Sequence, residues 1–173
     1  MMQIRCDGRL ALQLILLLAL WCPSAWAWGP EGHQAVGLIA TKYLTPGTRE
    51  RVDQLLAGEY LGDVRVTSWA DYLRGNKRMR TIFPDNDRWH YLDGDIHAGP
   101  EAFQPSADGN DVVSQVLRWQ KTLADTQQSP EKHRDAVRFL AHFVGDMHQP
   151  LHCADREGDR GGNLVPVHAF LGA

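Results

Sequence analysis

Apolar residues along most of this chain recur every three or four positions, which is the spacing of an α-helix. After Pro30, a proline suited to a first helical turn, Ala35, Leu38, Ile39 and Tyr43 follow this spacing. No stretch keeps the alternation of a β-strand. Helices are expected from Pro30 to before Pro46, around Val52–Leu56, from about Val64 to Leu73, from Val112 to Leu123 and from Pro130 to near Pro150.

Residues that favour caps and turns divide this pattern. Pro46 and Gly47 separate the first two helices, and Ser129 is a suitable N-cap for the last one. Residues 76–108 are rich in Gly, Pro, Asp and Asn and are expected to form a long loop. A loop of this length inside a compact domain usually serves function. The pattern predicts an all-α fold in one domain, with its chemistry on helix ends and loops.

The first 27 residues have the composition of a signal peptide. Arg5 and Arg9 precede an apolar stretch over 10–21, which is shorter than the roughly 20 residues that span a bilayer. Ala25-Trp26-Ala27 matches a signal-peptidase site. We expect cleavage to leave a domain over 28–173 that begins with Trp28. A lipidated Cys22 and an uncleaved anchor are the weaker alternatives.

The composition narrows the function. The formal net charge of −3 argues against nucleic-acid binding through a broad basic face, but not against a nuclease that attracts phosphate with bound metal. The chain has six tryptophans, which are expected mainly in the core. Cys153 is the only cysteine after residue 27, so structural metal is a suitable substitute for disulfides.

The clearest chemical pattern is His142-x-x-x-Asp146, followed by His152. Side chains at i and i+4 share a helix face and can hold one ion, and zinc accepts both imidazole nitrogen and carboxylate oxygen. The alternative is a buried His–Asp pair without metal. Three other histidines are given ordinary roles: a solvated His97, a surface His133 and a hydrogen-bonded His148.

Three further segments offer ligands. Trp28-Gly29-x-x-Gly32-His33 would place a free α-amine near an imidazole, although a capping loop with a surface histidine explains it as well. Asp71 has Arg74 three residues later, and His90 has Asp93. The alternative for these pairs is a surface ion pair of little energetic value.

Together, these segments resemble the zinc-dependent single-strand nuclease family of fungi, plants and bacteria. The order is Trp-Gly-x-x-Gly-His, Trp-Ala-Asp, Trp-His-Tyr-x-Asp, His-x-x-x-Asp-x-His-Gln-Pro-Leu-His and Gly-Gly-Asn. The resemblance implies a helical domain, related to zinc phospholipase C, with three zinc ions in a cleft. The implied zinc ligands are Asp71, His90, His142 and Asp146 for one ion; Trp28, His33 and the bridging Asp146 for a second; and His152 for a third.

The resemblance also implies roles in catalysis and substrate binding. Arg74, Asp93 and Asp146 are the expected catalytic residues, with Arg74 near the scissile phosphate. Tyr91, Asp93 and Asn163 are the expected contacts to substrate, with Tyr91 stacking on a base. The implied activity is hydrolysis of single-stranded DNA and RNA to 5′-phosphate products, together with 3′-nucleotidase activity. The enzyme is expected to be secreted or periplasmic, without a membrane anchor after cleavage and without a stable protein partner.

One part of the family pattern is missing. The family's Asn-Leu-His-x-x-Trp-Asp motif, which completes the third zinc site, does not follow Gly161-Gly162-Asn163. The domain is therefore expected to lack its C-terminal part. Two other functions stay open at this point: a phosphodiesterase like zinc phospholipase C, and an inactive metal-binding remnant.

Overall fold

The computed structural model describes residues 28–159 and 161–165, and the expected signal peptide lies outside them. No strand occurs in this part of the chain, where Asp95 and Asp155 form an isolated parallel bridge, so the expected all-α class is confirmed. None of its helices has the length and apolarity to cross a bilayer. The elements are α2 (Pro30–Tyr43), α3 (Pro46–Leu56), α4 (Val64–Thr67), α5 (Trp69–Gly75), α6 (Lys77–Ile82), η1 (Asn86–Arg88), η2 (Pro100–Phe103), α7 (Val112–Ala124) and α8 (Pro130–His148).

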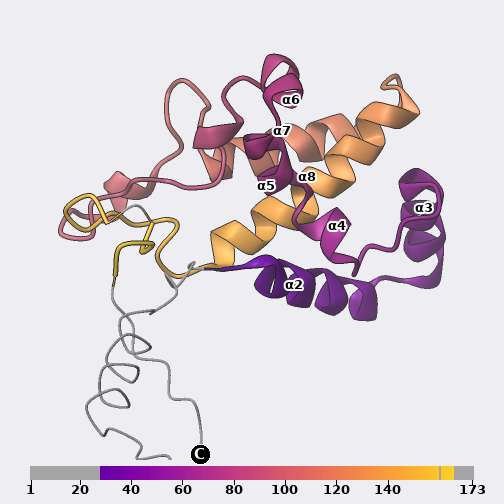
Figure 1. The fold of residues 1–173 in the computed structure, drawn as a ribbon, viewed down its shortest axis with the longest axis horizontal. Helices are drawn as coiled ribbons and strands as arrows, with labels where there is room; N and C mark the ends of the chain where they lie inside the picture. Colours follow the sequence, from indigo (N-terminus) through magenta and orange to yellow (C-terminus); the bar gives the residue numbers. More distant parts are fainter. Residues whose placement is uncertain (1–27, 160, 166–173) are drawn as a thin grey trace, which may run out of the picture. The chain divides into compact units, whose positions relative to one another are not determined.

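The longest helix, α8, organises the others (Figure 1): it contacts α2, α3, α4, α5 and α7. It begins where the sequence predicts, because the hydroxyl of Ser129 caps it by accepting from the backbone N–H of Lys132 at 3.3 Å. Its buried positions include Phe139 and Phe143, and also His142 and Asp146. The helix that supports the core therefore also carries two of the expected metal ligands.

Aromatic side chains form the core beside α8. Phe139 is fully buried, and its ring centroid lies 4.4 Å from that of Trp119 and 5.0 Å from that of Trp69. Phe83 and Trp89 also contact it, at 5.2 and 5.7 Å. Truncating a buried aromatic side chain to alanine typically costs about 3–5 kcal/mol. This cluster therefore fixes α8 relative to α5, α7 and the segment before His90.

Two expectations about the middle of the chain are wrong in detail. The helix expected over Val64–Leu73 divides at Ser68, whose φ of −104° and ψ of 12° are not helical. The loop expected over 76–108 contains α6, η1 and η2. The side chain of Asn76 caps α6 by accepting from the N–H groups of Arg78 and Met79, a cap that the loop interpretation overlooked.

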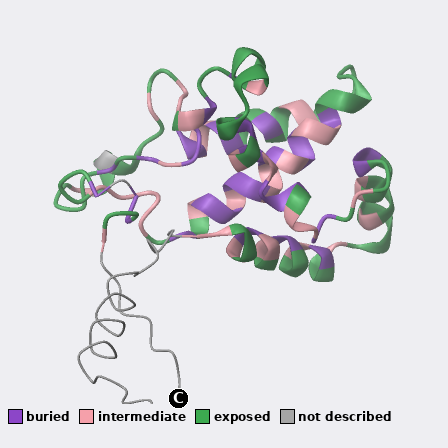
Figure 2. Cartoon of the chain, viewed as in Figure 1, coloured by how far each residue is buried: buried purple, intermediate pink, exposed green. Residues whose placement is uncertain are grey.

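The residues that reveal α2 in the sequence are not the ones that it buries. Leu38, Ile39 and Tyr43 are exposed, and the helix buries His33, Gly37 and Thr41 instead. Figure 2 shows that buried and exposed positions alternate along this helix. The expectation of a surface His133 is also wrong: this side chain is buried, and its Nε2 lies 2.9 Å from the carbonyl oxygen of Asp125. A polar side chain such as that of His133 can therefore be buried where a backbone group hydrogen-bonds to it.

Candidate metal centre

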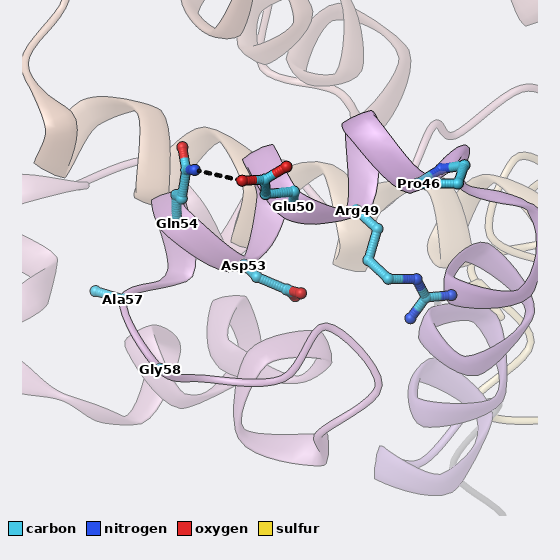
Figure 3. A pocket seen from close by; sticks show the side chains of 7 residues that line it. All are labelled: Pro46, Arg49, Glu50, Asp53, Gln54, Ala57 and Gly58. Atoms are coloured by element: carbon cyan, nitrogen blue, oxygen red, sulfur yellow. Dashed lines mark hydrogen bonds between the residues drawn. The ribbon is translucent and has the colours of Figure 1, made fainter.

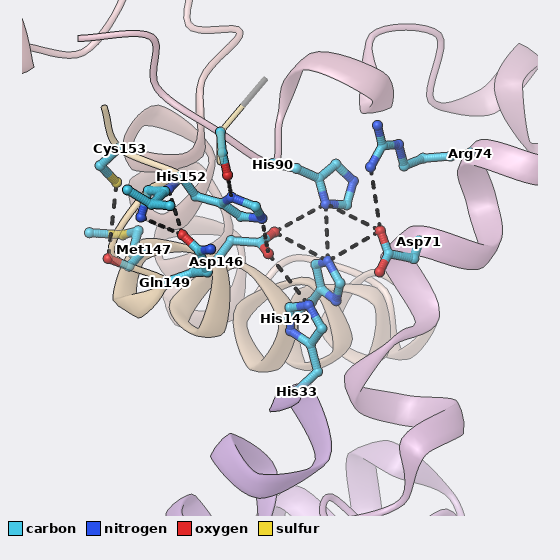
Figure 4. A network of polar contacts seen from close by, with 12 residues as sticks. His33, Asp71, Arg74, His90, His142, Asp146, Met147, Gln149, His152 and Cys153 are labelled. Carbon is cyan, nitrogen blue, oxygen red and sulfur yellow. Dashed lines mark hydrogen bonds and ion pairs between the residues drawn. The ribbon is translucent and has the colours of Figure 1, made fainter. Parts of the chain in front are cut away.

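Six of the seven expected metal ligands converge on one place (Figure 4). The seventh, Trp28, is close to this group, since its ring centroid lies 6.2 Å from that of His33. The six come from α2, from α5, from the segment after η1, from α8 and from the segment after α8. They are His33, Asp71, His90, His142, Asp146 and His152.

Four ligand atoms form the first set. The Nδ1 atom of His90 lies 3.0 Å from both His142 Nε2 and Asp146 Oδ2, and the last two atoms are 3.2 Å apart. Asp71 Oδ1 lies 3.7 Å from each of the two histidine nitrogens. Ligand atoms about 2.0–2.2 Å from a tetrahedral zinc lie about 3.3–3.6 Å from one another. The first set has the donor types and approximate spacing of such a site.

The hydrogen bonding of His142 also fits a metal ligand. Its Nδ1 lies 2.7 Å from the carbonyl oxygen of Thr67, so this nitrogen carries the proton and donates it. In the neutral ring, Nε2 then has a lone pair that faces the carboxylates of Asp71 and Asp146. Either a proton on Nε2 or a metal ion between these atoms would offset the repulsion, and a metal ion takes the neutral ring as its ligand. Metal-bound histidines commonly donate their second N–H to a backbone carbonyl in this way.

Asp146 joins the first set to a second one. Its Oδ2 faces His90 and His142, whereas its Oδ1 lies 3.4 Å from His33 Nε2 and 3.8 Å from His152 Nε2. Each oxygen of one carboxylate therefore faces a different group of imidazoles. A carboxylate placed in this way could bridge two metal ions.

The segment after α8 holds His152 in place. Its backbone N–H donates to the side-chain oxygen of Gln149 at 2.8 Å, and its Nδ1 lies 3.0 Å from the carbonyl oxygen of Gly161. Its carbonyl accepts from the N–H of Leu92 at 2.8 Å. The segment that carries His152 is thereby hydrogen-bonded to the segment that follows His90, and the Nε2 of His152 is left to face Asp146.

The ring of His33 is fixed by close packing. It stacks on the ring of His142 with a centroid distance of 3.8 Å and an interplanar angle of 18°. Gly145 lies against its other nitrogen, because a Cβ at residue 145 would be 2.9 Å from His33 Nδ1. Burial, assisted by the neighbouring His142, lowers the pKa of His33 to about 4. The ring is therefore neutral near pH 7, which is the form that binds metal.

Burial and charge compete at the other ligands. Burial opposes ionisation of Asp146, but His142 and His90 outweigh it and hold the pKa of this carboxyl well below its usual range. Burial likewise opposes charge on His142, yet the carboxylates of Asp146 and Asp71 raise the pKa of this imidazole. At His90 burial prevails and lowers the pKa. The bridging carboxylate is therefore ionised at neutral pH.

Arg74 lies at the edge of the first set. Its Nη1 is 3.6 Å from Asp71 Oδ1, and its Nε is 3.5 Å from Asp87 Oδ1. Asp87 also pairs with Arg80. The Arg74 side chain is 42% exposed, so its guanidinium is held beside a metal-ligand candidate and is still open to solvent.

The expected substrate residues lie on the segments around the centre. Tyr91 follows His90 directly and is partly buried. Asp93 is an exposed residue, but its carboxyl group is partly shielded from solvent. This shielding, and to a smaller extent the negative charge of Asp155, raises the pKa of Asp93. Neither side chain hydrogen-bonds to a metal-ligand candidate within the described part of the chain. Asn163 is exposed and follows two glycines of positive φ.

Sequence reasoning missed the groups that orient the ligands. The carbonyl groups of Thr67 and Gly161 have no sequence signature, because any residue supplies them. Gln149 was passed over, although its buried side chain holds the backbone of His152. Gly145 could have been noticed, because a glycine inside a long helix costs about 1 kcal/mol relative to alanine and needs a reason.

A surface pocket of about 660 Å³ lies elsewhere, along α3 and the turn that follows it (Figure 3). It contains none of the ligand candidates and is lined by Pro46, Arg49, Glu50, Asp53, Gln54, Ala57 and Gly58. The histidine and aspartate centre is therefore separate from this pocket.

Comparison with known proteins gives a consistent result. A family model described as S1/P1 Nuclease matches residues 28–172. Endonuclease 4 of Arabidopsis thaliana is 30% identical over 168 residues, which are 90% of this chain and 54% of that protein. Nuclease P1 of Penicillium citrinum is 28% identical over 147 residues, 81% of this chain and 52% of that protein. Nuclease S1 of Aspergillus oryzae is 25% identical over 149 residues, 82% and 49% of the two chains.

The chain spans about half the length of the curated relatives it matches. The family match nevertheless begins at Trp28 and includes every candidate ligand up to His152. It confirms the resemblance on which the interpretation of those residues depends. With a helical fold and a histidine and aspartate centre on the matched residues, the chain belongs to the S1/P1 nuclease family.

Proposed function

We propose that this protein is a zinc-dependent endonuclease that hydrolyses single-stranded DNA and RNA to 5′-phosphate products and also removes 3′-phosphates from nucleotides. The observation that carries the proposal is the position of Asp146, whose two carboxylate oxygens face two different groups of imidazoles. Family membership supports phosphodiester hydrolysis as the reaction.

The donors favour zinc over magnesium and calcium. Two imidazole nitrogens and two carboxylate oxygens form the first set, and zinc accepts both types in tetrahedral sites. Magnesium and calcium prefer sites made only of oxygen. When bound, zinc supplies Lewis acidity and lowers the pKa of a water ligand towards 7.

The chain's own residues supply the rest of the chemistry. Asp146 and Asp71 carry the negative charge that holds cations at the centre. Arg74 is open to solvent beside Asp71, so its guanidinium can bind a phosphate oxygen and neutralise charge that develops there. Tyr91, next to His90, offers a ring on which an unpaired base can stack, which favours single strands over duplexes. Asp93 and Asn163 are proposed to contact the nucleotide.

Export would complete the centre. We propose that a signal peptidase removes residues 1–27, so that the new amino group and carbonyl oxygen of Trp28 join His33 and Asp146 around a second zinc. The start of the family match at Trp28 supports this position. His152 would contribute to a third zinc. The destination would be the periplasm or the medium.

A pair of buried histidines on α8 provides a sharp test. His142 faces the centre, whereas His133 is bonded to the carbonyl oxygen of Asp125. We expect His142→Ala to lose zinc and to lower cleavage of a single-stranded oligonucleotide by more than about 100-fold. Even substitution of a residue that only hydrogen-bonds to a metal ligand typically lowers metal affinity or activity by about 10–100-fold. His133→Ala should keep both properties. The measurements are zinc per chain by elemental analysis and product termini by mass spectrometry.

Three results would contradict the proposal. One is full activity of the wild-type chain after zinc has been removed by a chelator. Another is equal loss of zinc in the two histidine variants. The third is hydrolysis of phosphatidylcholine, without cleavage of single-stranded DNA or RNA, by the zinc-loaded chain.

A further inference from the structure

A basic segment lies directly beside the metal centre. Residues 74–80 contain four basic residues and no acidic one, although the whole chain has a formal net charge of −3. The segment covers the end of α5 and most of α6, and its basic residues are Arg74, Lys77, Arg78 and Arg80. None of the sequence patterns interpreted above assigns a role to the last three.

The helix α6 turns its basic side chains to solvent. Met79 is partly buried and packs against the aromatic core. Because successive helical residues are about 100° apart, Lys77, Arg78 and Arg80 then lie on the remaining faces. All three are exposed. Within the described residues, no ion pair involves Lys77 or Arg78.

Ion pairs connect this segment to the metal centre. Asp71 contacts Arg74, Arg74 contacts Asp87, and Asp87 contacts Arg80. The chain from Asp71 to Arg78 spans at most about 15 Å between Cα atoms, at 1.5 Å per helical step and 3.6 Å for each step on either side of Asn76. That length corresponds to no more than about four nucleotides at a rise of 3.4 Å.

We propose that α6 binds backbone phosphates of a polynucleotide strand that continues beyond the metal centre, chiefly through Lys77 and Arg78. This inference rests on the proposed function, to which it adds a preference for strands over dinucleotides. The chemistry is electrostatic: among the described residues, the ammonium of Lys77 and the guanidinium of Arg78 have no carboxylate partner, and they lie within a few nucleotides of a strand held at the centre. Arg80, oriented by Asp87, adds a third cation to the same surface.

Salt dependence measures such contacts directly. Each neutralised phosphate of a single strand contributes about −0.7 to the slope of log K against log salt concentration. Removing two contacts should therefore reduce the magnitude of the slope by about 1.4.

The variant is Lys77→Ser/Arg78→Ser, and the matched control is Lys42→Ser/Arg51→Ser. The control removes the same charge from exposed residues at the end of α2 and on α3. Binding of a labelled oligothymidylate of about 12 nucleotides, within the 4–16 covered by known strand-binding folds, is measured by anisotropy. The protein is loaded with zinc for this measurement, and phosphorothioate linkages, which keep the backbone charge, protect the strand from cleavage. Cleavage of the same strand with ordinary linkages and of a dinucleotide is then measured with zinc.

We expect the α6 variant to bind the strand roughly tenfold more weakly near physiological salt, with the smaller slope, and to cleave the dinucleotide at the wild-type rate. The control should bind like the wild type. Equal weakening in both variants, or in neither, would overturn the proposal. If the zinc-loaded wild type cleaves neither substrate, the proposed function fails, and the binding comparison still decides whether α6 contacts the strand.

Discussion

The two ligand sets that share Asp146 are built in different ways. In the first set, four side chains come from α5, from α8 and from the segment anchored by buried Asn86, whose amide donates to the carbonyl oxygen of Ala70. In the second set, His33 and His152 face the other carboxylate oxygen, at 3.4 and 3.8 Å, and we propose that His33 helps to hold the second zinc and His152 the third. The first set comes from two helices and from a segment hydrogen-bonded to one of them, whereas the second includes residues towards the ends of the matched segment.

The two sets therefore differ in what they need in order to bind metal. The first set needs only the packing that also builds the core, since α5 and α8 are fixed by Trp69 and Phe139. The second set needs local events: release of an amino group at Trp28, close packing at His33 and a turn that holds His152. Changes in these features should therefore affect the two sets unequally, and the following predictions test that.

The largest effect is expected for Asp146→Asn, which replaces the carboxylate shared by both sets with an amide. We expect loss of metal from both positions and a decrease in activity of more than about 100-fold. Asp71→Asn should weaken the first set alone. Zinc per chain, measured by elemental analysis and native mass spectrometry, distinguishes the two variants. Undiminished zinc content in Asp146→Asn would show that this residue is not a bridge.

A smaller effect is expected from one extra residue placed before Trp28. The amino group of Trp28 would become an amide, which lacks the lone pair that binds metal. Zinc content should fall by about one ion per chain, whereas the first set keeps its metal. The comparison is between chains that begin at Trp28 and chains that begin one residue earlier. Equal zinc content in both would show that the amino group of Trp28 is not a ligand of the second set.

The smallest effect is expected for Gly145→Ala. Alanine usually stabilises a helix by about 0.5–1 kcal/mol relative to glycine, but here the added Cβ would lie 2.9 Å from His33 Nδ1. The imidazole must move, and affinity for the second metal should fall by roughly tenfold. Gly47→Ala on α3 is the control, because its Cβ meets nothing within 4 Å. Competition with a chromophoric chelator measures the affinity of each variant for the second metal. Equal affinities in Gly145→Ala and Gly47→Ala would disprove close packing at His33.

Helical spacing and caps predicted most of the fold. The ends of α7 and α8 were found because Val116 and Trp119 mark an apolar stripe and because Ser129-Pro130 is a strong start signal. The same reasoning missed α6, whose basic residues give no apolar stripe, and the break at Ser68. It also misplaced His133, since a histidine gives no sign in the sequence of the carbonyl that will satisfy it.

The candidate site could be predicted only in part. Spacing alone indicated that His142 and Asp146 share a helix face. His33, Asp71, His90 and His152 were recognised as possible ligands, but their assignment to a common centre came from the resemblance, because the fold that brings them together is set by long-range packing. Their orientation depends on backbone carbonyls and on Gly145, which leave little trace in the sequence.

Because α8 contains Phe139 and Phe143 as well as His142 and Asp146, the proposed metal site and the folded core share one structural element. A ligand that binds only the native state stabilises it by RT ln(1 + [L]/Kd), about 4 kcal/mol at a thousandfold excess over Kd. Substitutions that loosen the aromatic cluster would then be tolerated while cations are abundant and become damaging when they are scarce. The supply of the metal would thus determine how many core substitutions this protein can tolerate during evolution.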